Sequence, residues 1–371
     1  MIPHPSWIEI DLGQFKKNIA IIRAFIGKRL FCLPIKANAY GHGLSAIGKA
    51  AEEAGVDYLA VAHLQEGVQL RLAGIKLPIL VLGAIHEEQI ADLLRFDLEF
   101  SISSKFKADL VASKWREDLP KCRVHLEMDT GMQRTGVRPT TLPSLFEQVQ
   151  KLGCFEVVGI YSHFAKADHP DDPLAKEQLK QFTRALEHPV FSGFSFLRHL
   201  ANSGAVAHFP DSHLDMVRPS LMTFGYLPEA APKALAGIAP CLSLKTKISY
   251  FKVVEAGQGI SYGHTHITSC QTRIVTIPIG YGDGYRRGLS GKSFALIRGK
   301  RFPIIGTICM DQCMVDIGNE EAYVGDEVVL IGKQGNEEIS AAQIAELCDT
   351  NLYEVLCFFN HRLPRIYKSE N

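Results

Sequence analysis

The chain has 371 residues, more than one ordinary domain holds, and 46% of them are apolar, which is enough for two cores. Its 40 basic and 40 acidic side chains balance, so the composition provides no charged surface for nucleic acid or an anionic membrane. The nine cysteines form no Cys-x-x-Cys pair, the start lacks a leader pattern, and no apolar run reaches roughly 18 residues. These features predict a cytoplasmic protein with reduced thiols, without a disulfide framework, a metal site or a membrane span.

Between Phe31 and Arg218, eight short apolar runs alternate with longer amphipathic stretches. This alternation predicts parallel strands separated by helices, and eight units over about 200 residues are typical of a (β/α)8 barrel. An open doubly wound sheet is the alternative, but the number of strands favours the barrel. The predicted strands are Phe31–Ile35, Tyr58–Ala62, Ile79–Leu82, Leu98–Ile102, Cys122–Met128, Val157–Tyr161, Phe196–Leu200 and Leu214–Val217. The clearest predicted helices are Leu44–Ala54, Lys105–Trp115, Leu142–Lys151 and Leu174–Leu186.

The pattern changes after Lys233, where short β-rich runs separated by glycine-containing turns take over. Ser340 and Gln343 have the spacing of a capping box and predict one helix inside this region. The predicted strands are Leu242–Val254, Arg273–Ile279, Phe294–Arg298, Phe302–Met310, Met314–Ile317 and Glu327–Ile331. We therefore predict an α/β protein, with a (β/α)8 TIM-type barrel over residues 12–236 and a mostly β C-terminal domain over residues 237–371. Residues 1–11 are a candidate for pairing with the second domain.

Lys36 stands where the first predicted barrel strand ends and a run of small, polar and glycine residues begins. The usual pKa of a lysine is about 10.4, and an apolar wall lowers it by disfavouring the ammonium form. A neutral amine can form a Schiff base, which is the standard way to hold pyridoxal phosphate. The alternative is a lysine that ends the strand and points to water.

Polar residues also follow four later barrel strands. Because the carboxyl ends of barrel strands build the active site, these residues are expected to converge near Lys36. Each has a plain structural alternative, such as a core histidine for His163 or a helix cap for Ser203, but the set together favours a catalytic site. The segments are Glu127 to Arg134, Ser162-His163, Asn202-Ser203-Gly204 and Arg218-Pro219-Ser220.

The segment around Lys36 and seven further motifs resemble, in the same order, the motifs of alanine racemases. The further motifs are Asp129-Thr130-Gly131-Met132 with Arg134, Ser162-His163-Phe164-Ala165, Ala201-Asn202-Ser203, Val217-Arg218-Pro219, Ser261-Tyr262-Gly263, Gly280-Tyr281-Gly282-Asp283-Gly284-Tyr285 and Cys309-Met310-Asp311. The resemblance implies a pyridoxal 5'-phosphate enzyme that interconverts L-alanine and D-alanine with two bases and supplies D-alanine for peptidoglycan. It also implies a homodimer with shared active sites.

The resemblance assigns catalytic roles to four residues. Lys36 would hold the cofactor and act as one base, and Tyr262 of the partner subunit would be the base on the opposite face of the substrate. His163 and Arg218 would belong to the network that lowers the pKa of this phenol. Arg218 would donate to the pyridine nitrogen, because an arginine keeps its proton at ordinary pH.

Further residues are implied in binding. Arg134 would bind both the phenolic oxygen of the cofactor and the carboxylate of the substrate. The other implied cofactor-binding residues are Tyr40, Asn202, Ser203 and the backbone amides of Ser220 and Leu221, and the other implied substrate-binding residues are Tyr281 and Met310.

Four residues depart from the pattern of the family. Glu127 stands where many relatives carry a carbamylated lysine, so a permanent carboxylate would replace the modified side chain. Gln133 and Ser220 replace glycines, and His361 is expected to stand where many relatives carry a tyrosine of the substrate gate.

Three other functions are weighed against alanine racemisation. A broader amino-acid racemase is disfavoured because such relatives are typically exported, and we expect no export signal in this chain. A decarboxylase of the same barrel class would leave the Tyr262 segment without a function. A non-catalytic pyridoxal-phosphate carrier would resemble the barrel alone and would not explain the β-rich second domain.

Overall fold

The computed structural model describes residues 4–369, and the chain divides into two compact units. One unit consists of Gln14–Ala39 and Leu44–Pro240. The other contains the chain from Cys241 onward, the residues up to Gly13 and the short segment Tyr40–Gly43.

The first unit contains a closed barrel of eight parallel strands. Each strand pairs with the next along the chain, and β9 pairs with β2 to close the barrel. The strands are β2 (Leu30–Pro34), β3 (Tyr58–Val61), β4 (Ile79–Val81), β5 (Glu99–Ile102), β6 (Cys122–Glu127), β7 (Phe155–Tyr161), β8 (Leu197–His199) and β9 (Met216–Val217). The prediction of a closed barrel over an open sheet is confirmed, and all eight predicted strands are present.

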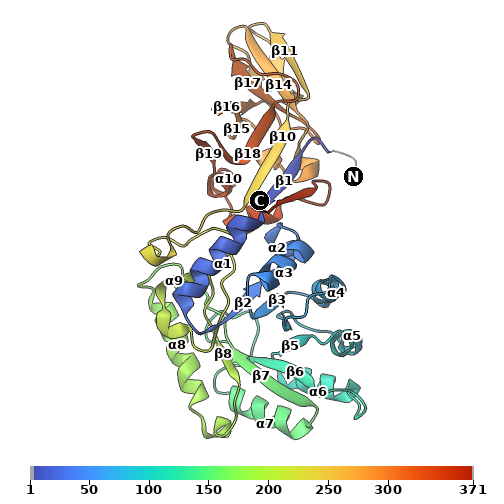
Figure 1. Cartoon of the computed structure of the whole chain (residues 1–371), viewed down its shortest axis with the longest axis vertical. Coiled ribbons are helices and arrows are strands. Elements are labelled where there is room, and N and C mark those ends of the chain that lie inside the picture. The colour runs from blue at the N-terminus through green and yellow to red at the C-terminus, as the bar shows by residue number, and fades with distance from the viewer. Residues whose placement is uncertain (1–3, 370–371) are drawn as a thin grey trace. The chain divides into compact units, whose positions relative to one another are not determined.

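Burial on both faces explains why these strands read as continuous apolar runs. Every residue of β3 and β4 is buried, as expected for parallel strands enclosed by helices. Figure 1 shows helices arranged around the barrel strands. The helices are α1 (Leu12–Ile26), α2 (Lys36–Tyr40), α3 (Leu44–Glu53), α4 (Leu64–Leu72), α5 (Ile90–Arg95), α6 (Lys105–Lys114), α7 (Leu142–Leu152), α8 (Pro173–Leu186) and α9 (Ser203–His208).

Local sequence explains where the longer helices begin. Ser104 caps α6 by accepting a hydrogen bond from the Lys107 amide, 3.2 Å away. Asp172 caps α8 by accepting from the Leu174 amide at 2.9 Å, and Pro173 occupies the first helical position, where no amide proton is needed. The four helices predicted from the sequence correspond to α3, α6, α7 and α8, and each predicted end lies within one residue of the observed end.

The second unit is built around a large, mostly antiparallel sheet. Its strand order is β11-β14-β17-β16-β15-β18-β10-β1-β20, and β19 pairs with β18. The strands are β1 (Trp7–Asp11), β10 (Leu242–Lys247), β11 (Tyr250–Val254), β14 (Thr272–Ile277), β15 (Phe294–Ile297), β16 (Lys300–Ile305), β17 (Cys313–Gly318), β18 (Glu327–Gln334), β19 (Glu337–Ile339) and β20 (Arg365–Lys368). The strands β12 (Gly259–Ile260) and β13 (His266–Ile267) form a separate pair.

Two strand predictions in this unit are wrong. The predicted strand Phe302–Met310 stops at Ile305, where β16 ends, and Gly306 follows with a φ of 67°. The run Leu242–Val254 is not a single strand, because the chain changes its pairing partner at Ile248 and Ser249. Before this point β10 pairs with β18, and after it β11 pairs with β14. β-prone residues continue through this point, so the sequence gives no signal for such a change of neighbour.

The ends of the chain complete this unit. Strand β1 lies between β10, to which it is antiparallel, and β20, to which it is parallel. Two short helices follow β19, namely α10 (Ala341–Leu347) and α11 (Leu352–Cys357), and Ser340 caps the first by accepting from the Gln343 amide at 3.0 Å. No helix within residues 4–369 is long and apolar enough to cross a membrane.

Candidate active site

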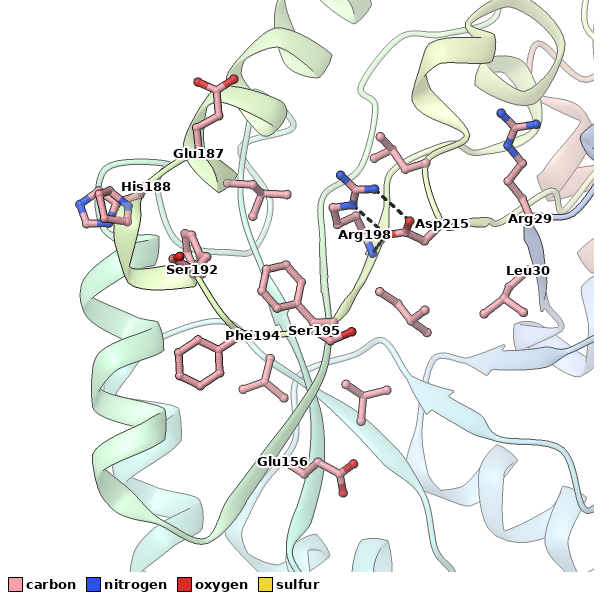
Figure 2. Close-up of a pocket in the computed structure, with 18 of the residues that line it drawn as sticks. Arg29, Leu30, Glu156, Glu187, His188, Ser192, Phe194, Ser195, Arg198 and Asp215 are labelled. Atoms are coloured by element: carbon pink, nitrogen blue, oxygen red, sulfur yellow. Dashed lines mark hydrogen bonds and ion pairs between the residues drawn. The ribbon is translucent and has the colours of Figure 1, made fainter.

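A cavity of about 1180 Å³ opens in the first unit at the amino-terminal ends of its strands. Leu30, Glu156 and Arg198 line it at the starts of β2, β7 and β8, and Figure 2 shows the ion pair between Arg198 and Asp215 within it. The predicted site residues follow the carboxyl ends of the strands, which is the end where barrel enzymes carry their chemistry. The candidate site is therefore at the other end of the barrel from this cavity.

Lys36 comes two residues after the end of β2 and begins a strained turn. Ala37, Asn38 and Ala39 have φ angles of 53°, 56° and 54°, and Tyr40 has a φ of 49°. The left-handed conformation costs roughly 1–2 kcal/mol for each residue other than glycine, so four in succession need support from their surroundings. Such strain is concentrated at functional sites, and here it directly follows the candidate cofactor lysine.

Hydrogen bonds to side chains support this turn. The Glu66 carboxylate accepts from the Ala37 amide at 2.7 Å, and the Asn38 side-chain oxygen accepts from the Leu44 amide at 2.8 Å. These bonds fix the direction in which the chain leaves Lys36.

Arg218 follows β9 and is almost completely buried. Its Nη1 donates to His199 Nδ1 at 2.7 Å, and its Nη2 donates to the Ser162 carbonyl at 2.7 Å and to His163 Nδ1 at 3.3 Å. The guanidinium carbon also lies 5.3 Å from the centre of the Tyr161 ring. Burial lowers the pKa of Arg218, but a guanidinium keeps its proton, so this site holds a fixed cation that can only donate.

His163 is held as a neutral imidazole beside this cation. Burial, together with the charges of Arg218, Arg134 and Lys36, lowers the pKa of His163 to about 3. Gln178 of α8 holds the loop around it, because its buried amide donates to the His163 carbonyl at 3.0 Å and accepts from the Ala165 amide at 3.0 Å. At neutral pH, His163 therefore accepts from Arg218 and has one ring N–H left to donate.

Buried hydroxyl and amide groups gather after β8 and β9. The Ser203 hydroxyl accepts from the Ser220 amide at 2.9 Å and from the Met222 amide at 3.3 Å. Leu221 is buried between these two amides in the chain, and Asn202 caps α9 by accepting from the Ala205 amide at 3.0 Å. Clustered donors of this kind suit an anionic group, and the loops after the last two strands are the usual phosphate site of a barrel.

Glu127, the last residue of β6, is also buried. The Thr135 hydroxyl donates to its Oε1 at 2.7 Å. Burial raises the pKa of this carboxyl, although the Thr135 bond and the charges of Arg134 and Arg218 act in the opposite direction. Arg134 itself is exposed, and Gln133 before it has a φ of 56°, a left-handed conformation that glycine adopts more easily than glutamine.

The second unit brings together the segments that carry Tyr262, Tyr281 and Met310. The Ser261 hydroxyl donates to the Thr307 carbonyl at 2.6 Å, and the Thr307 hydroxyl donates to the Tyr262 carbonyl at 2.9 Å. The Tyr281 amide donates to the Cys309 carbonyl at 3.1 Å. All three predicted side chains are exposed, and Tyr262 is 72% exposed.

Several residues that the sequence reasoning missed belong to these sites. In the second unit, the ring of Tyr353 lies 5.8 Å from that of Tyr40, so a second phenol accompanies the predicted one. His361, expected to replace a gate tyrosine, is exposed. In the barrel, His125 and His199 extend inward from Arg218. Neither histidine stands at the carboxyl end of a predicted strand followed by a polar loop motif, so the sequence pattern did not single them out.

Comparisons with known proteins cover both units. The model of the alanine racemase N-terminal domain matches residues 10–228, and that of the alanine racemase C-terminal domain matches residues 241–367. An alanine racemase of Symbiobacterium thermophilum is 39% identical over 368 residues, covering 99% of this chain and 98% of that protein. An alanine racemase of Carboxydothermus hydrogenoformans is 41% identical over 368 residues, covering 98% of this chain and 99% of that protein.

Solved structures agree with these matches. The alanine racemase of Clostridium difficile 630 superposes with a TM-score of 0.94 at 35% identity, covering 100% of this chain and 97% of that one. The alanine racemase of Bacillus anthracis with bound L-Ala-P gives a TM-score of 0.92 at 34% identity, covering 99% of this chain and 96% of that one. Two family models and full-length relatives above 30% identity lead to one conclusion: the chain belongs to the alanine racemase family.

Proposed function

We propose that this protein is a pyridoxal-phosphate-dependent alanine racemase that interconverts L-alanine and D-alanine with two bases. The observation that carries the proposal is Arg218, a buried, permanently charged donor at the carboxyl end of β9. A donor that cannot release its proton suits a pyridine nitrogen that is to stay unprotonated. This restrains the build-up of carbanion character and limits side reactions such as transamination.

The residues of the barrel fit pyridoxal phosphate. Lys36 supplies an amine for the covalent link, and the buried Ser203 hydroxyl with the amides of Ser220 and Leu221 provides donors for a phosphate. Asn202 shapes the start of α9, and Tyr40 is a further proposed cofactor ligand. The chemistry that pyridoxal phosphate supplies when bound is electron withdrawal from the substrate Cα, which acidifies its C–H bond.

Two proton carriers on opposite faces are needed, because a single fixed base would return the proton to the face from which it came. Lys36 Nζ carries the proton on one face, and Tyr262 Oη of the partner subunit carries it on the other. Lys36 serves the D-alanine face and Tyr262 the L-alanine face. Arg134 binds the substrate carboxylate, and Glu127 stabilises the positive charge of this arginine without a carbamate. Tyr281 and Met310 line the substrate pocket.

An exposed apolar surface of the second unit supports a homodimer. Besides Tyr262, it includes Tyr250, Phe251 and Val253 of β11 and Ile267 of β13, all largely exposed. Surfaces of this kind are typical of protein contacts. The nine cysteines are all free thiols, which fits a cytoplasmic protein, and its D-alanine would serve peptidoglycan.

The direct test is formation of D-alanine from L-alanine by the purified protein supplied with pyridoxal phosphate. We expect an equilibrium close to equal amounts of the two isomers, reached from either side, and no conversion by Lys36→Ala. Absence of conversion by the wild-type protein with bound cofactor would refute the proposal. Equal activity on many other amino acids would favour the broader racemase, and binding without turnover would favour a carrier.

A further inference from the structure

A line of buried polar side chains runs through the barrel interior from Arg218 to Glu99. Arg218 Nη1 lies 2.7 Å from His199 Nδ1, and His199 Nε2 lies 2.9 Å from His125 Nδ1. His125 Nε2 then lies 2.9 Å from Glu99 Oε2. The other oxygen of Glu99 pairs with Arg123 and accepts from the Tyr58 hydroxyl at 3.3 Å. The line joins the start of β5 to the carboxyl end of β9.

The barrel is shaped around this line. His125 and His199 have no exposed surface, and Glu99 is 1% exposed. A Cβ atom on Gly159 of β7 would lie 2.3 Å from His125 Nδ1, so only glycine leaves room for this imidazole. The ring of Tyr161 stacks on that of His199 at 5.0 Å and 15°. Each imidazole is therefore fixed in place by its neighbours as well as by its hydrogen bonds.

Donor and acceptor roles along the line are determined from both ends. Arg218 can only donate, so His199 Nδ1 must accept and its proton must be on Nε2. His199 Nε2 then donates to His125 Nδ1, which places the proton of His125 on Nε2. The carboxylate of Glu99 can only accept, and it takes this last hydrogen bond. One arrangement of protons satisfies every group, with a cation at one end and an anion at the other.

We propose that Glu99 is a positioning residue for Arg218, which it holds through the tautomers of His125 and His199. By accepting the proton of His125 in a charge-assisted bond, Glu99 makes His199 Nδ1 a permanent acceptor facing Arg218. The guanidinium is thus fixed in orientation. The inference depends on the proposed function only where Arg218 acts on pyridoxal phosphate; the tautomers themselves are a property of the chain.

The first test uses the full-length protein without cofactor, labelled with ¹⁵N-histidine and studied by NMR. Wild-type protein should show unprotonated Nδ1 and protonated Nε2 on both His125 and His199. A protonated Nδ1 on either ring would overturn the proposal without any variant. His213, whose ring instead bonds the Val206 carbonyl at 2.9 Å, is an internal reference outside the line.

Variants of Glu99 test its part directly. Glu99→Leu removes the acceptor, so the His125 signals should move toward the average of the two tautomers, the His199 Nδ1 signal should shift, and His213 should not change. Glu99→Gln keeps an acceptor oxygen for His125 and should restore the wild-type tautomers. Glu156→Gln, at the exposed start of β7, two strands from β5 in the barrel, is the matched control and should leave all three rings unchanged.

Cofactor affinity is the second readout. Titration of the cofactor-free chain with pyridoxal phosphate should show at least tenfold weaker binding for Glu99→Leu, with Glu99→Gln between it and the wild type. A folded Glu99→Leu protein with wild-type ring signals and wild-type affinity would overturn the proposal. Wild-type tautomers as predicted, combined with no binding of pyridoxal phosphate by the wild-type chain, would instead refute the proposed function and leave the hydrogen-bonded line intact.

Discussion

Glu127→Gln should separate the contribution of this carboxylate to activity from its effect on the stability of the fold. The side chain is 6% exposed, and burial raises its pKa above the ordinary value despite the nearby charges of Arg134 and Arg218. Since the folded state holds this proton more tightly than the unfolded state, stability falls as the pH rises from the unfolded to the folded pKa. Each unit of difference corresponds to about 1.4 kcal/mol. The glutamine variant lacks this loss and should gain stability relative to wild type between acidic pH and pH 8.

Activity should change in the opposite direction. The Thr135 hydroxyl can still donate to the amide oxygen of the variant, so the local fold is retained, while the charge facing the two arginines is lost. A neighbouring opposite charge commonly shifts a pKa by one to two units, about 1.4 kcal/mol each, so losing it predicts a loss in kcat/KM of roughly tenfold to hundredfold. The assay is racemisation from both isomers alongside denaturant unfolding at pH 5 and pH 8. Wild-type activity should not depend on bicarbonate. Undiminished activity of Glu127→Gln would show that this carboxylate takes no part in positioning Arg134.

Three further predictions concern single residues. Borohydride reduction of the holoenzyme followed by peptide mapping should label Lys36, and a label on another lysine would contradict the assignment. Gln133→Gly should raise the free energy of unfolding by about 0.5–1 kcal/mol in denaturant unfolding, because glycine adopts a φ of 56° without strain. A loss of stability would show that Gln133 is not strained. The pKa of His163 near 3 means that the unfolded state binds a proton that the folded state rejects between about pH 6.5 and 3. Stability should therefore fall by up to about 1.4 kcal/mol per pH unit on acidification, and His163→Asn should reduce that slope.

The barrel could be predicted because most of its strands are apolar runs, and the burial of β3, β4 and β5 on both faces leaves a clear pattern. Placement of polar residues at the ends of these runs then indicated Lys36, His163 and Arg218. The second unit was predicted less well, since Leu242–Val254 changes pairing partner within a continuous run of β-prone residues.

Contacts between side chains of different barrel strands could not be predicted from the sequence. Glu99 and His199 read as ordinary residues of short strands, and their alignment with His125 depends on the stagger of the closed barrel. The left-handed turn after Lys36 is equally hidden, because alanine and asparagine do not ordinarily favour four such residues in succession. In both cases, tertiary contacts impose a conformation that local sequence preferences do not specify.

The central claim is that Lys36 and Tyr262 of the partner subunit act on opposite faces of one substrate. Lys36→Ala and Tyr262→Phe chains should each be strongly impaired alone, with Tyr262→Phe selectively losing α-hydrogen exchange from L-alanine. The decisive measurement is racemase activity in purified heterodimers of the two variants. Half of the sites in such a dimer regain both bases, so we predict partial recovery of activity. No recovery in proven heterodimers would contradict the account and place both bases in one chain.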